Sequence, residues 1–180
     1  MKPCLLIFAM LCFCFACNKQ SERKPDFLEV RITRQTALEG GETLVLRKID
    51  KDWSAMLLGD GYRFSCLYQK SVQPKSGWEN LWEELLSNGV LEIPDGRRMT
   101  NSIDGNQYIV EVNYQNKLKR YQFENPDQLK TKDAEQLRNI GNSISREFET
   151  PMFISNYERG KVGDYLTEQC RSYSGQDSIN

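Results

Sequence analysis

The chain has 180 residues, no histidine, and nearly balanced charge, with 24 lysines and arginines against 25 aspartates and glutamates. Without histidine, Ser-His-Asp and Cys-His catalysis in their usual forms and histidine-ligated zinc sites are excluded. The balanced charge argues against a nucleic-acid binder, which usually has a strongly basic domain or patch. The sequence also has no glycine-rich phosphate-binding motif. We therefore predict no cofactor, no metal, no catalytic residue and no nucleic-acid partner.

Residues 1–16 have the features of a secretory signal peptide. A single basic residue, Lys2, precedes an almost unbroken apolar run that extends from Cys4 to Ala16. A membrane span needs about 20 apolar residues, whereas the apolar region of a leader needs only about 7 to 15. Because the run is too short to span, we expect residues 1–16 to be removed during export.

The expected cleavage site lies directly before Cys17. Small residues occupy the positions one and three before the cut, which are Ala16 and Cys14. The stretch FAC, which ends at Cys17, resembles the lipobox of bacterial lipoproteins, in which this cysteine is diacylated through its sulfur. That family usually has leucine where this chain has Cys14. The resemblance covers only the leader, and it implies a lipid attached to Cys17, followed by a polar tether over residues 17–26.

The same resemblance bears on location and partners. It implies a bacterial envelope protein, and several acyl chains give stable attachment because each buried CH₂ contributes about 0.8 kcal/mol. Asn18 stands where an aspartate retains many lipoproteins at the inner membrane, so the resemblance implies the outer membrane, facing the periplasm. A secreted protein is the alternative. The expected partners are the membrane, through the N-terminal lipid, and another envelope protein.

Apolar and polar side chains alternate in the first half of the mature chain, which is the period of half-buried strands. This pattern, with its glycine and aspartate turns, predicts four strands at residues 27–33, 42–49, 53–58 and 62–69. Residues 107–114 and 117–124 predict a hairpin around Gln115 and Asn116. The basic residues at 117–120 are interpreted as edge charges that block aggregation.

Two segments have the apolar period of a helix. The first buries a stripe formed by Trp78, Leu81, Trp82 and Leu85. Ser76 and Glu79 predict a capping box at its start, and Gly89 predicts a left-handed end. The second runs from about Asp133 to Phe148, and Gly141 within it is expected to allow close approach to the sheet.

Together these elements predict an α+β fold with about six antiparallel strands, in the order ββββα then ββα, and two helices packed on one face. The predicted domain covers residues 27–155, and residues 156–180 are expected to form a C-terminal extension that is partly mobile. The predicted core includes Trp78, Trp82, Leu85, Val110, Val112, Leu137, Ile144 and Phe148.

Two cysteines remain in the body of the chain, Cys66 and Cys170. In an oxidising compartment such a pair is a candidate disulfide. The alternative is a buried free thiol at Cys66, on an apolar strand face, because sequence alone cannot show that two cysteines are close together.

The segment 94–106 is the candidate binding loop, because irregular connections of this length usually serve as lids or binding loops or remain mobile. Two arginines, Arg97 and Arg98, stand between Asp95 and Asp104, which suits recognition of an anionic group on a partner. The alternative is a flexible surface loop whose charges keep it soluble.

Two functional classes follow from the sequence. The first is a non-enzymatic envelope lipoprotein that binds another component of the envelope. The second is a carboxylate-dependent hydrolase that acts on envelope glycan, because two catalytic carboxylates can lie far apart in a sequence. A deep pocket with two convergent carboxylates would favour the hydrolase, whereas a filled core and a shallow surface would favour the binding module.

Overall fold

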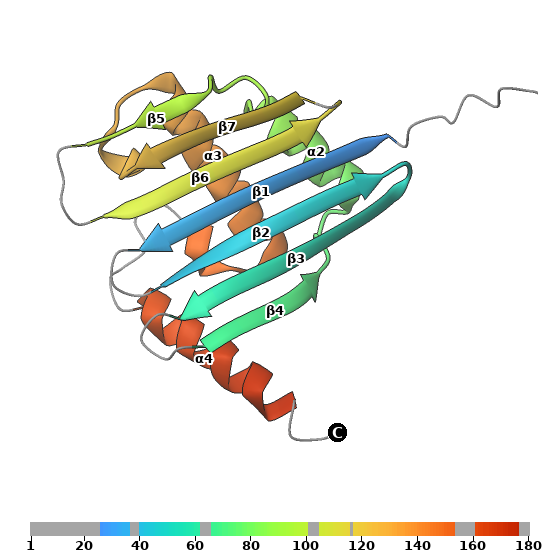
Figure 1. Cartoon of the computed structure of the whole chain (residues 1–180), viewed down its shortest axis with the longest axis vertical. Coiled ribbons are helices and arrows are strands. Elements are labelled where there is room, and N and C mark those ends of the chain that lie inside the picture. Colours follow the sequence, from blue (N-terminus) through green and yellow to red (C-terminus); the bar gives the residue numbers. More distant parts are fainter. Residues whose placement is uncertain are drawn as a thin grey trace, which may run out of the picture.

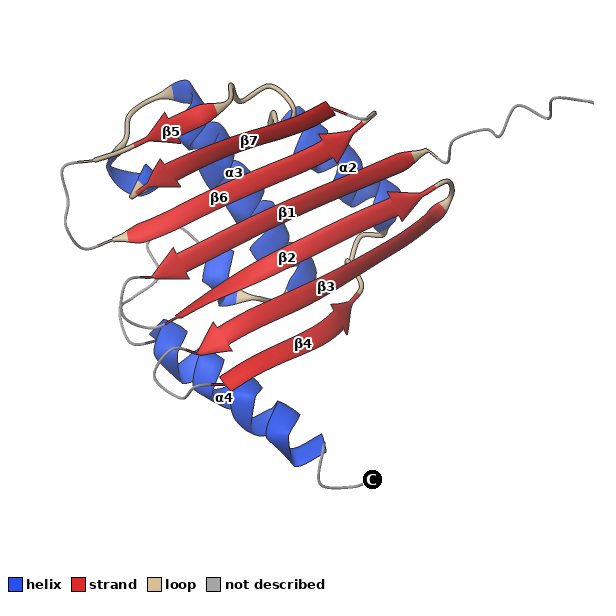
Figure 2. Ribbon diagram, viewed as in Figure 1, coloured by secondary structure: helices blue, strands red, loops and turns tan. Residues whose placement is uncertain are grey.

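The computed structural model describes residues 26–36, 40–61, 66–100, 105–115, 117–153 and 161–176. These residues form one seven-stranded sheet and three α-helices (Figures 1 and 2). The strands are β1 (Phe27–Thr36), β2 (Gly40–Ile49), β3 (Asp52–Gly61), β4 (Cys66–Val72), β5 (Gly96–Arg98), β6 (Asn106–Tyr114) and β7 (Lys117–Glu124). The helices are α2 (Trp78–Ser87), α3 (Lys132–Phe148) and α4 (Lys161–Gln176), with short 3₁₀ turns η2 (Pro126–Gln128) and η3 (Pro151–Phe153). The α+β prediction is confirmed, with one more strand and one more helix than expected.

The sheet has the strand order β4-β3-β2-β1-β6-β7-β5. The first four strands form an antiparallel meander, as their alternating patterns predicted. β6 pairs with the other side of β1, so the first strand of the chain lies in the middle of the sheet. The predicted hairpin is confirmed by the pairing of β6 with β7, which turns at Gln115 with a φ of 51°. Of the strand predicted at 62–69, residues 62–65 lie outside the described residues.

β5 was not predicted, and it makes the sheet mixed because it runs parallel to β7. Its three residues, Gly96–Arg98, pair with Tyr121–Phe123 and have no alternating apolar pattern of their own. The basic residues 117–120 therefore belong to a strand that is second from the edge. They precede the paired part of β7, so within the described sheet this half of the strand keeps an open side.

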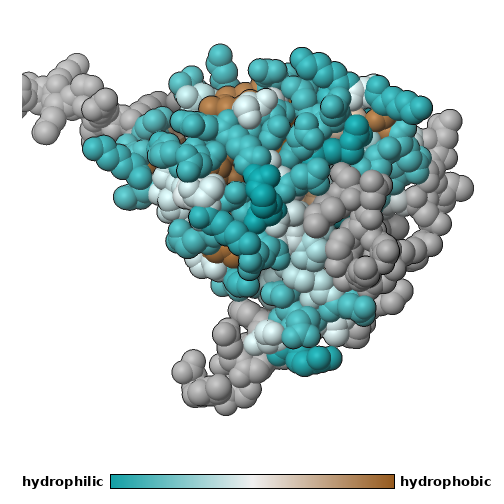
Figure 3. Space-filling view, turned by 180° about the vertical axis from the view of Figure 1, so that it is seen from behind, coloured by the Kyte–Doolittle hydropathy of each residue, from teal (hydrophilic) through white to brown (hydrophobic). Residues whose placement is uncertain are grey.

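The core lies between the sheet and the helices. β1 directs Leu28, Val30 and Ile32 toward it, and each of these side chains is at most 3% exposed. The outer surface on the helix side is mostly hydrophilic, with small isolated apolar areas (Figure 3). This is the pattern expected for amphipathic helices whose apolar stripes face the sheet. Two of the predicted core residues, Trp78 and Trp82, are half-buried. The other six are buried, namely Leu85, Val110, Val112, Leu137, Ile144 and Phe148.

α2 begins differently from the prediction. Its N-cap is Gly77, and no side chain caps it, so the capping box of Ser76 and Glu79 is wrong. The backbone N–H of Ser76 instead donates to the carboxylate of Glu147 at 2.8 Å, a contact with α3 that the local sequence could not reveal. The predicted left-handed end is confirmed at Gly89, whose φ is 82°.

α3 follows its predicted stripe, and Thr131 caps its start by accepting a hydrogen bond from the backbone N–H of Ala134 at 3.4 Å. Gly141 does allow a close approach, but to η3 rather than to the sheet. A Cβ at Gly141 would lie 2.5 Å from the carbonyl oxygen of Phe153. Absence of a side chain here lets the turn after α3 fold back against the helix.

α4 lies inside the predicted C-terminal extension and packs against β3, β4 and η3. Its buried side chains are Leu166, which is 1% exposed, and Cys170, which is 9% exposed. Both join the same core as the sheet residues. Residues 161–176 therefore belong to the folded unit rather than to an appendage of it.

Candidate functional site at the tether end

One end of the sheet lies where the chain enters the domain, and we call it the tether end. There β1 begins at Phe27, which pairs with Ile49, the last residue of β2. Leu28 pairs with Tyr114 at the end of β6, and Tyr114 pairs with Lys117 at the start of β7. In Figure 1 the start of β1 accordingly lies beside the β6–β7 turn, with α2 behind it.

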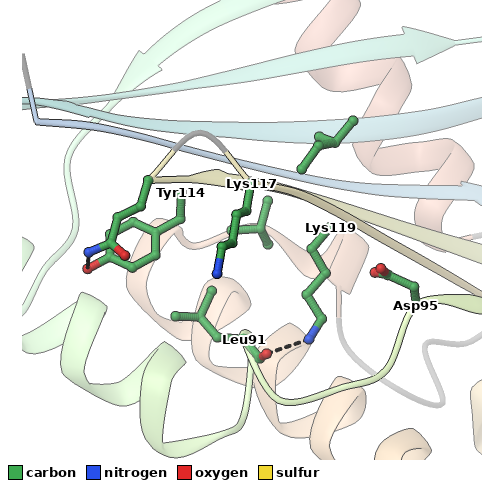
Figure 4. Close-up of a pocket in the computed structure, with 8 residues that line it drawn as sticks. Leu91, Asp95, Tyr114, Lys117 and Lys119 are labelled. Carbon is green, nitrogen blue, oxygen red and sulfur yellow. Dashed lines mark hydrogen bonds between the residues drawn. The ribbon is translucent and has the colours of Figure 1, made fainter. Parts of the chain in front are cut away.

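A cavity of about 380 Å³ opens at this end, between the β6–β7 hairpin and the segment that follows α2 (Figure 4). We call it the hairpin cleft. The turn at Gly89 carries the chain from α2 to Leu91, opposite the hairpin. The residues that line the cleft are Leu91, Asp95, Val112, Tyr114, Gln115, Lys117, Leu118 and Lys119.

The β6–β7 register places two lysines in the cleft. Lys119 pairs with Val112 and Lys117 pairs with Tyr114. Since Val112 is only 1% exposed and faces the core, the alternation of a strand directs both lysines to the helix side of the sheet. The Lys119 ammonium donates to the carbonyl oxygen of Leu91, whereas Lys117 forms no hydrogen bond or ion pair with any described residue (Figure 4).

Asp95 is the carboxylate among the described lining residues of the hairpin cleft. Its Oδ1 accepts the backbone N–H of Arg120 at 2.9 Å, which ties the segment after α2 to β7. Tyr114 accepts a hydrogen bond from the side-chain amide of Gln115 at 3.2 Å. The cleft thus offers two ammonium groups, an engaged carboxylate and apolar walls, a combination that suits a ligand with an anionic group next to apolar atoms.

Both arginines of the candidate loop form ion pairs with carboxylates of the same chain. Arg97 forms an ion pair with Glu124. Arg98 donates to Asp133 at 3.0 Å, and its guanidinium lies 5.0 Å from the centre of the Phe123 ring. These contacts hold β5 against β7 and α3. Asp104 lies outside the described residues, and Asp95 belongs to the hairpin cleft.

From the sequence alone, the two cleft lysines are interpreted as edge charges that block aggregation, not as site residues. Their alternation with Leu118 and their position beside a hairpin turn were visible, and the same period assigns Lys117 and Lys119 to the side of the apolar residues of β6. What no sequence pattern could show is that Leu91, from a connection after a helix, lies opposite them. The position of this wall of the cleft, opposite the lysines, depends on how α2 crosses the sheet.

A second polar cluster lies at the far end of the sheet, around Glu42, which is only 1% exposed. Its carboxylate accepts hydrogen bonds from the hydroxyls of Tyr68 at 2.5 Å, Thr150 at 2.5 Å and Tyr165 at 3.0 Å. Burial raises the pKa of Glu42, although the three hydroxyl groups oppose the rise. The three donors lie on β4, on α4 and just after α3, so this cluster joins separate elements, and both carboxylate oxygens are already engaged.

Nearby, the buried guanidinium of Arg34 lies 5.4 Å from the ring centre of Tyr108. Burial raises the pKa of Tyr108 to about 12, although the charge of Arg34 opposes the rise. The Tyr108 hydroxyl donates to the carbonyl oxygen of Phe153 at 3.4 Å. This tyrosine is therefore a packing residue, and Tyr114 at the other end of the same strand is the one that lines the cleft.

Cys17 lies outside the described residues, as does the side chain of Cys66. Cys170 takes part in a disulfide. Among the described residues, no three cysteine, aspartate or glutamate side chains gather in a way that could hold a metal ion. No helix within the described ranges is long and apolar enough to cross a membrane.

Comparisons of the chain with protein-family models, with curated proteins and with solved structures found no match.

Proposed function

We propose that the chain is a lipid-anchored lipoprotein of the bacterial envelope that acts as a binding module rather than as an enzyme. The leader and the FAC stretch support the anchor at Cys17. The observation that carries the binding role is the hairpin cleft, whose lining includes two lysines and a carboxylate that already accepts a backbone N–H.

The alternative hydrolase would need two carboxyl groups facing each other across a cleft, about 5 to 10 Å apart. In the hairpin cleft the described lining residues provide Asp95 alone. Glu42, the most buried carboxylate of the described residues, is surrounded by three hydroxyl donors at the far end of the sheet. Both arrangements favour a binding role over carboxylate chemistry.

Intact-mass measurement of the protein from a bacterial host tests the anchor. We expect a mass equal to that of residues 17–180 plus two or three acyl chains, and recovery in the membrane fraction. Cys17→Ala should abolish membrane recovery, whereas Ser21→Ala, a matched change in the same tether, should preserve it. An unmodified chain that begins at Cys17, or an uncleaved chain, would refute the anchor.

Incubation of the purified protein with isolated envelope glycan tests the enzymatic alternative. We expect no release of reducing ends above the level of a heat-inactivated sample. Release that persists in the wild type and disappears in Asp95→Asn would overturn the binding assignment in favour of a hydrolase.

A further inference from the structure

We infer that the hairpin cleft binds the phosphate of an anionic phospholipid headgroup, so that the tether end of the domain docks on the membrane that anchors it. The inference rests on the proposed function, because the lipid on Cys17 is what brings the domain to that membrane. It goes further by naming the surface of contact and the chemistry that recognises it.

The tether brings the cleft within reach of the bilayer. Residues 17–26 can extend to at most about 35 Å, since each residue of an extended chain spans about 3.5 Å. The chain then enters β1, whose second residue, Leu28, pairs directly with the cleft residue Tyr114. The hairpin cleft therefore lies at the end of the domain to which the tether is attached.

The polar groups of the cleft match a phosphodiester. The Lys117 ammonium has all its donors available with respect to the described residues, and Lys119 gives one of its three N–H donors to Leu91. A phosphodiester presents charged oxygens that accept such donors in strong, charge-assisted hydrogen bonds. The cavity of about 380 Å³ falls within the size range of small-ligand sites, so a headgroup can enter it.

Apolar side chains at the same end suit the region just below the headgroups. Leu118, on β7, is 71% exposed, and Ile49, at the end of β2, is 48% exposed. Trp53, at the start of β3, is half-buried and stacks on Trp78 with ring centres 6.0 Å apart. Tryptophan and exposed aliphatic groups are favoured at the boundary between headgroups and acyl chains.

General electrostatic attraction does not account for docking at this end. Lys48 is engaged with Trp53 and Glu79, and the nearby turn also presents two acidic residues, Asp50 and Asp52. A surface with mixed charge gains little from a negative membrane as a whole. Recognition therefore depends on the two cleft lysines, and charge reversal there should matter more than equal charge reversal elsewhere.

The experiment uses residues 18–180, which lack the leader and the lipidated cysteine but retain every described element and the whole described core. Flotation is measured with vesicles of equal parts phosphatidylglycerol and phosphatidylcholine, and with vesicles of phosphatidylcholine alone. We expect binding to the anionic vesicles only, because phosphatidylcholine carries a choline cation beside the same phosphodiester, and this cation competes with the lysine ammonium groups for the phosphate oxygens. Equal binding to both, or to neither, would overturn the inference.

Variants locate the binding to the cleft. Lys117→Glu with Lys119→Glu should weaken binding to the anionic vesicles at least ten-fold, and Lys117→Glu alone, which breaks no bond to a described residue, should weaken it about three-fold or more. The matched control is Lys130→Glu with Lys132→Glu, two exposed lysines beyond β7 at the far end, at and just before the start of α3, where a negative charge is favourable. Equal losses in both double variants would overturn the inference.

A final arm separates a lipid headgroup from a free phosphate. Chemical-shift titration with glycerol 3-phosphate reports occupancy of the cleft by a soluble phosphate monoester. Saturation at micromolar concentration, together with failure to bind vesicles, would show a soluble ligand and overturn docking. The vesicle assay needs no acyl chain, so an unmodified Cys17 would refute the proposed anchor without altering this result.

Discussion

The hydroxyl of Tyr165 on α4 donates to the carboxylate of Glu42 on β2 at 3.0 Å, joining residues that lie 123 positions apart in the chain. Thr150, just after the end of α3, donates to the other oxygen of the same carboxylate at 2.5 Å. One buried side chain thus connects two helical segments to the sheet. Its protonation state consequently affects how firmly α4 is held.

The stability of the protein should depend on pH through Glu42. Burial raises the pKa of Glu42 above its ordinary value of 4.5, so the folded state binds this proton more tightly than the unfolded state does. The contribution of this proton to the free energy of unfolding is therefore fully present below pH 4.5, and it is lost as the pH rises through the raised pKa of Glu42. Glu42→Gln should flatten the pH dependence of the free energy of unfolding in that window, as measured by urea denaturation.

Glu29 provides a control of opposite sign. Its pKa is lowered because bonds to Arg47 and Arg31 outweigh the effect of burial. Its contribution to stability is present above pH 4.5 and is lost as pH falls through the lowered pKa. Identical changes of slope in Glu42→Gln and Glu29→Gln would contradict the assignment of the buried carboxylate.

Adjacent leucines of α2 should differ sharply when truncated. Leu85 is fully buried, whereas Leu86 is 37% exposed. Leu85→Ala should lower the free energy of unfolding by about 2 to 5 kcal/mol, because it leaves a cavity in the core. Leu86→Ala should cost about 1 kcal/mol or less. Equal effects of the two changes in urea denaturation would show that the helix is rotated from its described orientation.

The disulfide of Cys170 should involve Cys66. α4 packs against β4, which begins at Cys66, and the other cysteines of the chain all lie within residues 1–17. Peptide mapping without reduction should recover these two cysteines in one linked species. Closing a loop of about 100 residues should stabilise the protein by roughly 4 to 5 kcal/mol. Two reactive thiols in unreduced, denatured residues 18–180 would contradict the pairing.

A side chain at Gly59, the residue that pairs with Glu42 across β2 and β3, should disturb the Glu42 cluster. Gly59 pairs with Tyr68 across β3 and β4, and a Cβ there would lie 1.9 Å from the Tyr68 ring. Gly59→Ala should displace this ring, weaken its bond to Glu42 and cost about 1 to 3 kcal/mol. Ser54→Ala, on an exposed position of the same strand, should change stability by about 0.5 kcal/mol or less. Thermal melts of the two variants that coincide with each other would refute the expected clash.

The alternating strands and the two apolar helix stripes could be predicted from sequence because each signal is contained within one element. β5 could not, since its three residues take their conformation from a distant strand. The expected capping box failed for a similar reason, because Glu147 of α3 engages the backbone of Ser76. α4 has few apolar residues, and it is the contacts of Leu166 and Tyr165 with the rest of the domain that hold it.

The candidate site likewise combines a feature contained within one strand with features that depend on distant elements. Alternation along β7 was sufficient to place Lys117 and Lys119 on one side of a strand. The cleft itself needs a second wall, and Leu91 reaches it only because α2 crosses the end of the sheet before the chain turns at Gly89. The ion pairs of Arg97 and Arg98 could not be predicted from the loop itself, because their partners Glu124 and Asp133 come from later elements.

The central position of β1 sets the order in which a nascent chain can complete the sheet. β1 to β4 pair with their neighbours in sequence, so this half can form while the remainder is still being synthesised. The opposite side of β1 waits for β6, which begins only at Asn106. Until then its backbone groups are an open template for a strand of another molecule. Chains that stall before β6 should therefore be the species that aggregates and that a holding chaperone must cover.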